Sequence, residues 1–137
     1  MKEGLPYWGR DERMLAACAA LKEMSRQAGS FTRAECLEAL AWELRRMGID
    51  SERNKFFTRV LSNGFPKTAC ADFLVDGRII IMVVCVRRIT GSHFEELKRI
   101  LHVARQPEGY ILNAGEPDGP QLFGQFLGQY APEPEQA

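Results

Sequence analysis

The chain has 137 residues, of which 45% are hydrophobic and 26% charged, and its formal net charge is zero. This balance is typical of a globular domain and excludes a strongly basic nucleic-acid-binding protein, while no apolar run is long enough to span a bilayer. We expect a single cytoplasmic domain over residues 1–130, followed by a disordered tail over residues 131–137.

Four cysteines are present, and their spacing gives no C-x-x-C pair and no cluster with histidine. Zinc sites need such spacing and disulfide frameworks need an oxidising compartment, so we expect reduced thiols that act as small core residues. The sequence also has no glycine-rich phosphate loop and no recognisable nucleophile motif. These observations predict that the protein carries no cofactor.

Two helices are predicted at the start of the chain. Residues 11–27 are rich in helix formers, and their apolar residues recur at helical spacing. Thr32 and Glu35 then have the spacing of a capping box, in which the threonine caps the helix and the glutamate reaches back to it. A second helix is therefore expected to begin after Thr32 and to end near Gly48.

Three strands are predicted next. Glu52–Leu61 contains a candidate first strand, and Asp76-Gly77 lies between two apolar runs. This dipeptide favours a hairpin with a type I′ turn between strands at about Cys70–Val75 and Arg78–Val86. The apolar run that follows the turn has no polar interruption, which predicts a central strand covered on both faces.

The last part of the chain is expected to complete a mixed sheet. Ser92 and Glu95 have capping-box spacing, which predicts a third helix. Gly109–Asn113 is predicted as a strand that runs parallel to the preceding one through a right-handed crossover. Gln121–Tyr130 is interpreted as a short amphipathic helix, so the predicted order is α-α-β-β-β-α-β-α around a four-stranded sheet.

Several short motifs resemble those of a known family. Residues 38–49 read Glu-Ala-Leu-x-x-Glu-Leu-x-x-x-Gly-Ile, residues 71–75 read Ala-Asp-Phe-Leu-Val, and residues 79–81 are all isoleucine. Thr90 and His93 open the next helix, and residues 109–113 read Gly-x-x-Leu-Asn. This pattern resembles the small bacterial GxxExxY proteins, which are related to the PD-(D/E)XK nuclease superfamily. The resemblance implies an α/β (α+β) restriction-endonuclease-like fold with three layers.

The same resemblance implies a degenerate metal site. In that superfamily a Mg²⁺ ion is held by an Asp on one hairpin strand, by the Glu of a Glu-x-Lys on the next strand and by the backbone carbonyl between Glu and Lys. The metal activates a water, and the Lys orients or deprotonates this nucleophile. This chain keeps Asp72 but has Met82 and Val84 at the Glu and Lys positions. A thioether is a poor ligand for Mg²⁺ and valine offers no ligand, so we expect no resident metal and no catalytic residues.

The departures extend to the motif that names the family, because Ser30, Arg33 and Cys36 stand where Gly, Glu and Tyr are expected. Carboxylates from neighbouring helices could replace the missing glutamate if they reached Asp72, and Glu43 and Glu96 are the candidates. Otherwise Asp72 is expected to bind backbone N–H groups or a surface arginine. His93 is expected to cap or pack its helix.

These observations give three hypotheses of function. The first is a catalytically inactive nuclease-like domain that acts as a protein-binding or scaffolding module, with a protein partner or a second copy bound through a sheet edge or the helix of Phe123 and Phe126. The second is nucleic-acid binding without cleavage. The third is a Mg²⁺-dependent nuclease with migrated carboxylates. The candidate nucleic-acid contacts are cationic side chains: Arg45, Arg46, Arg53, Lys55, Arg59, Arg87 and Arg88.

Overall fold

The computed structural model describes residues 11–127, which form three helices and five strands. Their bounds are α1 Glu12–Ala28, α2 Arg33–Arg46, β1 Ser51–Val60, β2 Pro66–Val75, β3 Ile79–Val84, α3 Gly91–Ala104, β4 Glu108–Asn113 and β5 Gln121–Phe126. The predicted tail over residues 131–137 lies outside the described residues. No helix within residues 11–127 is long and apolar enough to cross a membrane.

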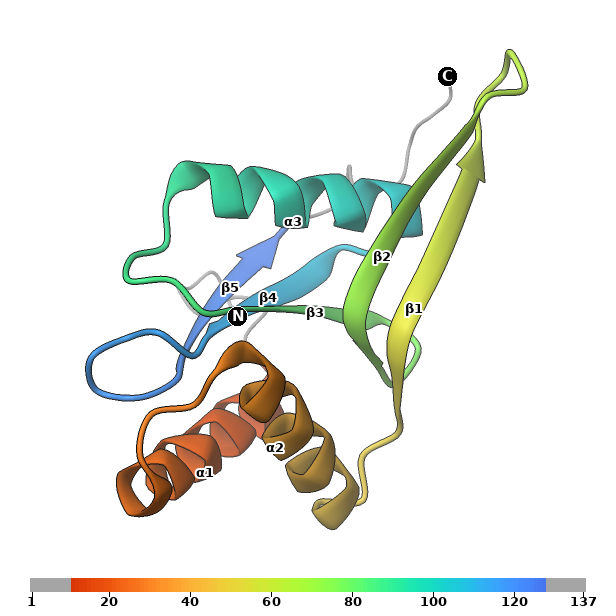
Figure 1. Ribbon diagram of the computed structural model, residues 1–137. Helices are drawn as coiled ribbons and strands as arrows, with labels where there is room; N and C mark the ends of the chain where they lie inside the picture. Colours follow the sequence, from red (N-terminus) through yellow and green to blue (C-terminus); the bar gives the residue numbers. More distant parts are fainter. Residues whose placement is uncertain (1–10, 128–137) are drawn as a thin grey trace, which may run out of the picture.

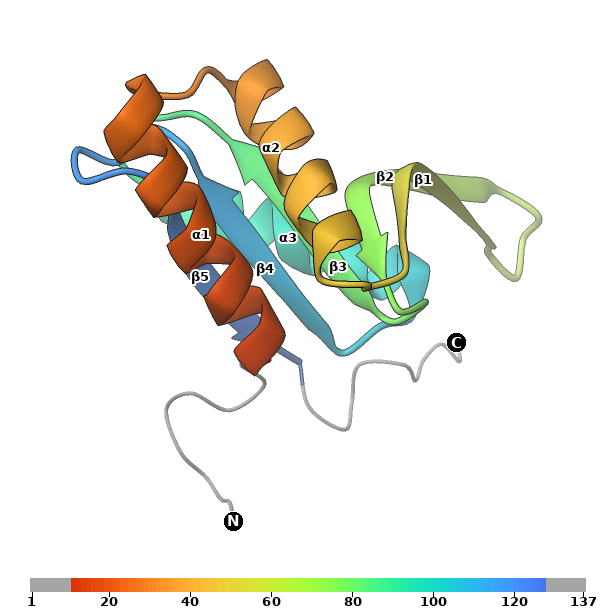
Figure 2. The ribbon, with the colours of Figure 1, turned by 90° about the horizontal axis from the view of Figure 1, so that it is seen from below.

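The sheet lies between two helical layers. Its strand order is β1-β2-β3-β4-β5, with β3 and β4 parallel and the other neighbours antiparallel. α1 and α2 cover one face and α3 covers the other (Figures 1 and 2). This mixed α/β arrangement confirms the predicted fold class, and β3 and β4 are parallel as predicted.

The central strand β3 is buried on both faces, as its sequence predicted. Ile79, Ile81 and Val83 belong to the core cluster beneath α1 and α2. Ile80 and Met82 belong to the cluster beneath α3. Successive side chains of a strand point to opposite faces, so an unbroken apolar run is what a strand between two helical layers requires.

Two local predictions are confirmed in detail. Asp76 and Gly77 have φ of 55° and 70°, the positive values that a type I′ turn needs, and the Arg78 N–H donates to the Val75 carbonyl at 3.0 Å. The Thr32 Oγ1 accepts from the Glu35 N–H at 3.1 Å, while the Glu35 carboxylate accepts from the Thr32 N–H at 2.9 Å. The second helix therefore begins with the predicted capping box.

The start of α3 differs from its prediction. The N-cap is Thr90 rather than Ser92, and the Thr90 N–H donates to the Nδ1 of His93 at 3.0 Å. The ring nitrogen of His93 thus accepts the hydrogen bond that the glutamate side chain accepts in the usual capping box. His93 caps this helix, which is the structural role expected for it.

The predicted helix over residues 121–130 is wrong, because residues 121–126 form β5 and residues 128–130 lie outside the described residues. β5 pairs antiparallel with β4, placing Leu122 opposite Leu112 and Phe123 opposite Ile111. Short apolar runs do not distinguish a helix from a strand, and here the open edge of β4 supplies hydrogen bonds that a helix would leave unmade. The sheet therefore has five strands rather than four.

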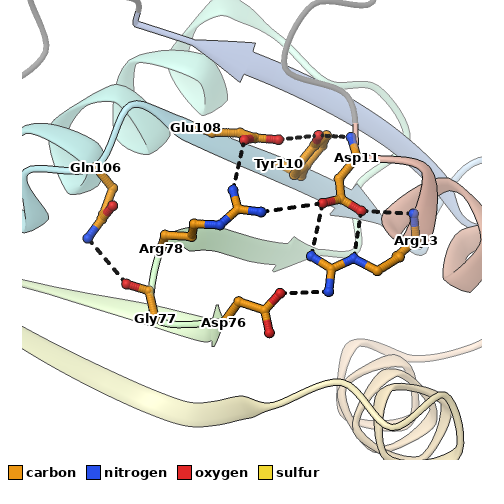
Figure 3. Close-up of polar contacts among 8 residues, drawn as sticks. All are labelled: Asp11, Arg13, Asp76, Gly77, Arg78, Gln106, Glu108 and Tyr110. Atoms are coloured by element: carbon orange, nitrogen blue, oxygen red, sulfur yellow. Dashed lines mark hydrogen bonds and ion pairs between the residues drawn. The ribbon is translucent and has the colours of Figure 1, made fainter.

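A polar cluster joins the start of α1 to the β2–β3 turn and to β4 (Figure 3). The Arg13 guanidinium contacts Asp11 at 3.0 Å and Asp76 at 2.6 Å. The Tyr110 hydroxyl accepts from the Asp11 N–H and donates to the Glu108 carboxylate at 2.7 Å. Asp11 is also the N-cap of α1 and accepts from the Arg13 N–H at 2.8 Å. Asp11 and Arg13 together therefore connect the start of α1 to the β2–β3 turn and to β4.

The hydrogen bond from the Arg13 side chain is the main reason that the pKa of Asp11 lies below its ordinary value of 3.8. A carboxyl group whose pKa is lowered by folding stabilises the protein above the unfolded pKa and loses that contribution as the pH falls through the folded pKa. We expect Asp11→Ala to lower the free energy of unfolding at pH 7 by about 1 kcal/mol through loss of the cap. Urea denaturation at neutral pH and at about pH 3 measures this difference.

The matched control is Asp11→Asn, which keeps a side-chain oxygen for the cap but removes the charge. Its stability at pH 7 is expected to lie between those of the wild type and Asp11→Ala. A stability gap between wild type and Asp11→Ala that stays the same size in acid would contradict the role assigned to the carboxylate.

Candidate functional site

The candidate site lies where β2 separates from β3. The two strands pair only from the turn as far as Phe73 and Ile81, after which β2 continues to pair with β1 and bends away from β3 (Figure 1). Asp72 is the first residue of β2 beyond the pairing. We call this point the fork, and it is defined by Asp72 on β2 and Val83 on β3.

Asp72 replaces the strand pairing that the fork removes. Its Oδ2 accepts from the backbone N–H of Val83 at 2.7 Å. A backbone N–H next to a buried strand needs an acceptor, and the carboxylate supplies it with a charge-assisted bond. Asp72 therefore binds a backbone N–H group, one of the structural roles that the sequence left open for it.

The second oxygen of Asp72 faces Arg33, the first residue of α2. The Arg33 Nη2 donates to Asp72 Oδ1 at 2.7 Å, and its Nε donates to the carbonyl oxygen of Val83 at 2.8 Å. The planar guanidinium thus bridges a carboxylate and a carbonyl. The Arg33 side chain is 48% exposed and that of Asp72 is 17% exposed, so this contact lies at the surface end of the fork.

The residues at the fork do not fit a Mg²⁺ ion. The site that the resemblance implies would use the Asp72 carboxylate and the carbonyl of Val83, and both accept hydrogen bonds from Arg33. A permanent guanidinium charge beside these oxygens competes with a divalent cation for the same lone pairs. Among residues 11–127 there is no group of three His, Cys, Asp or Glu side chains that could hold a metal.

Met82 and Val84 lie on the other side of the sheet from α2. Met82 is 8% exposed within the apolar cluster under α3, together with Leu97 and Ile100. Val84 is half-buried and packs against the same cluster. The two positions where the superfamily has Glu and Lys thus contribute apolar contacts to the α3 layer.

The two candidate replacement carboxylates do not reach the fork. Glu43 is only 2% exposed and binds Arg46 of the same helix, at 2.6 and 3.1 Å. Glu96 is exposed on α3 and binds Arg99, whose hydrogen bond lowers the pKa of Glu96. Each carboxylate has its own arginine three residues later, and neither contacts Asp72.

The candidate nucleic-acid contacts do not share one surface. Arg53 lies over the Phe73 ring at 5.2 Å and contacts Glu38 of α2 at 3.4 Å. The Arg59 guanidinium instead donates to the His102 carbonyl of α3, on the opposite face of the sheet. The remaining candidates are partly neutralised or exposed: Arg46 binds Glu43, Lys55 binds Glu52 at 3.2 Å, and Arg45, Arg87 and Arg88 are exposed.

Arg33 is a residue of the fork whose contacts the sequence does not reveal. The resemblance marks it only as a departure from the family motif, where the family has a glutamate. The available signal was the reversal of charge at that position beside an expected carboxylate. Arg33 and Asp72 are 39 residues apart, so no local sequence pattern indicates that they form an ion pair.

A family profile and a solved structure resemble this chain. The profile of the PD-(D/E)XK nuclease superfamily matches residues 15–121. A similar solved structure is the crystal structure of SSO0001, with 15% sequence identity and a TM-score of 0.47, covering 69% of this chain and 59% of that one. The chain thus spans less than two thirds of that protein, and no curated protein matches it. The match to most of the chain shows that this protein belongs to the PD-(D/E)XK nuclease superfamily.

Proposed function

We propose that this protein is a degenerate member of the superfamily, of the GxxExxY type, that has lost metal-dependent cleavage and acts as a protein-binding or scaffolding module. The observation that carries the proposal is the bridge from Arg33 to Asp72 and to the Val83 carbonyl. We further propose that it acts in the bacterial cytoplasm, where its four unpaired thiols would remain reduced.

The chemistry of the fork supports loss of cleavage. Hydrolysis of a phosphodiester in this superfamily needs a metal to activate water and a lysine near the nucleophile. Arg33 does not replace that lysine as an activator of water, because a guanidinium offers only hydrogen-bond donors and no acceptor. Val84 has no group that could orient water. The fork offers one carboxylate, and that carboxylate is already bound to a backbone N–H and a guanidinium.

The distribution of apolar side chains supports a role in protein binding. Large hydrophobic side chains are exposed on the β1–β2 hairpin, where Phe56 is 71% and Phe65 is 60% exposed. Clustered apolar exposure on a domain of this size is typical of an interaction surface rather than of a solvated loop. This surface does not include the fork.

Binding of nucleic acid without cleavage is the second candidate function. It is supported by two consecutive exposed arginines, Arg87 and Arg88, in the connection between β3 and α3. Such binding would weaken steeply as salt rises, because it depends on phosphate contacts. A gel-shift titration with duplex and single-stranded DNA at low and physiological salt distinguishes this function from protein binding.

A plasmid assay tests the proposed loss of cleavage. Wild-type protein incubated with supercoiled plasmid and either Mg²⁺ or Mn²⁺ is expected to leave the plasmid intact, because the fork lacks a second carboxylate. Asp72→Ala serves as the matched control and is expected to behave identically in the agarose-gel assay. Cleavage that requires the metal and disappears in Asp72→Ala would show that the proposal is wrong.

The proposed role of Asp72 at the fork also predicts how substitutions there change the free energy of unfolding. Asp72→Ala leaves the Val83 N–H without its acceptor, so it is expected to lower the free energy of unfolding by about 1–3 kcal/mol in urea denaturation. Arg33→Ala removes a half-exposed ion pair and is expected to cost less than about 1 kcal/mol. Asp72→Asn keeps one acceptor oxygen and is expected to fall between these values.

A carboxylate that is retained to bind a ligand would have the opposite effect on stability. Its removal would raise the free energy of unfolding of the ligand-free protein, because an electrostatic cost is relieved. If Asp72→Ala were as stable as the wild type, or more stable, Asp72 would be a retained ligand-binding residue.

A further inference from the structure

One side of α3 lies along β5, the last strand of the sheet. The rings of Phe94 and Phe123 meet edge to face, with 6.4 Å between their centroids. Farther along the helix, the side chain of Leu101 lies against Gly109, which pairs with Gln125 of β5. The helix and the strand therefore run side by side. We call the following side chains the α3–β5 surface: Phe94, Lys98, Arg105, Phe123 and Gln125.

Lys98 and Arg105 place positive charge on this surface. They follow Phe94 by four and by eleven residues, a spacing that puts all three on one stripe of a helix. Neither cation has an ion-pair partner among residues 11–127. On the side of α3 that faces β2, by contrast, Arg99 binds Glu96 at 2.9 Å and donates to a β2 carbonyl at 3.1 Å. The stripe that faces β5 therefore offers two charges to an anionic group.

The side chain of Gln125 lacks a hydrogen-bond donor. Phe123 and Leu127 both belong to the cluster beneath α3, and residues two apart on a strand point to the same face. Gln125 lies between them and therefore faces α3 as well. Its Oε1 atom is buried and accepts no hydrogen bond from residues 11–127. A buried acceptor without a partner is costly, so a donor is needed at this point of the surface.

The described part of the chain ends beside this surface. Leu127 is 6% exposed, and its N–H donates to the Pro107 carbonyl, just beyond α3, at 2.7 Å. The next ten residues read Gly-Gln-Tyr-Ala-Pro-Glu-Pro-Glu-Gln-Ala, with one aromatic ring, two carboxylates and no cation. An extended chain covers about 3.3 Å per residue, so a segment of this length reaches both cations of the stripe.

We propose that residues 128–137 fold back along α3 and cover the α3–β5 surface of their own chain. Tyr130 follows Leu127 by three residues, which brings its hydroxyl within reach of the Gln125 Oε1 as the missing donor. The two glutamates of the segment would bind the two cations of the stripe. The opposite charges and the point at which the chain leaves β5 are what carry this inference.

This contact would make the segment a ligand that the chain carries for itself. Composition alone predicts disorder for residues 131–137, because prolines and polar side chains cannot build a core. The α3–β5 surface would supply the apolar and cationic contacts that the segment lacks. A partner protein that presents an aromatic ring and carboxylates in a short segment would compete for the same surface, so the contact would inhibit that binding. The inference is independent of the fork and of the exposed β1–β2 hairpin.

The test measures the {¹H}–¹⁵N heteronuclear NOE of the non-proline amides of residues 128–137 in the full chain, at low salt. Wild type is expected to give values close to those of α3, because docking restricts motion on the ps–ns timescale. K98E/R105E sets carboxylates against carboxylates and is expected to lower the values toward those of a mobile chain. E133K/E135K is expected to do the same. Combining the four substitutions restores opposite charges and is expected to restore the values.

R87E/R88E is the matched control, because it reverses two exposed cations in the connection that precedes α3. It is expected to keep the wild-type values. A segment that is mobile in the wild type, or a four-fold variant that does not recover, overturns the inference. Values that fall on dilution would place the segment on a second copy, which also overturns it. Each of these results leaves loss of cleavage standing, since the fork is not part of this surface.

Tyr130 provides a separate test of the contact with Gln125. Y130A removes both the ring and the hydroxyl and is expected to lower the NOE values of the whole segment. Y130F keeps the ring and removes only the donor, so its values are expected to lie between those of Y130A and the wild type. Wild-type values in Y130A would show that the contact assigned to Gln125 is wrong.

Discussion

The fork between β2 and β3 requires an acceptor for the Val83 N–H, and much of the molecule follows from how Asp72 provides it. Because the carboxylate replaces the lost ladder bond, β2 can leave β3 without an unpaired backbone group at its edge. As a result the β1–β2 hairpin can extend beyond the helices, while β3 continues between the two helical layers (Figure 1). The same carboxylate also holds the first turn of α2 through Arg33, so a charged contact joins the helical layer to the sheet at the fork.

Local chemistry made much of this fold predictable from sequence. The Asp76-Gly77 turn needs residues that tolerate positive φ, and the Thr32 cap needs a glutamate three residues later, so short stretches specified both features. β5 was missed because the hydrogen bonds that favour it come from β4, which no local pattern reveals. The same holds for the candidate site. The sequence indicates that Asp72 binds an N–H group or an arginine, but only the tertiary structure shows that the arginine is Arg33.

The side chains of β3 contribute to packing on both faces of the sheet. Met82 extends the apolar cluster under α3, and Val84 borders it, so the strand has gained hydrophobic contacts where the superfamily has charged groups. Burial of these side chains is favourable without any ligand, whereas paired carboxylates in an empty site repel each other. In the proposed function, the absence of Glu and Lys at positions 82 and 84 and the continuous apolar core are thus two consequences of the same residues.

If cleavage has been lost as proposed, the Arg33 bridge bears on what would be needed to regain it. Restoring Glu and Lys at positions 82 and 84 would place polar groups in the α3 layer while the guanidinium still held Asp72 and the Val83 carbonyl. Removing Arg33 alone would free those oxygens but would supply no second carboxylate. A metal site of the superfamily type at the fork would therefore need changes at positions 33, 82 and 84 together.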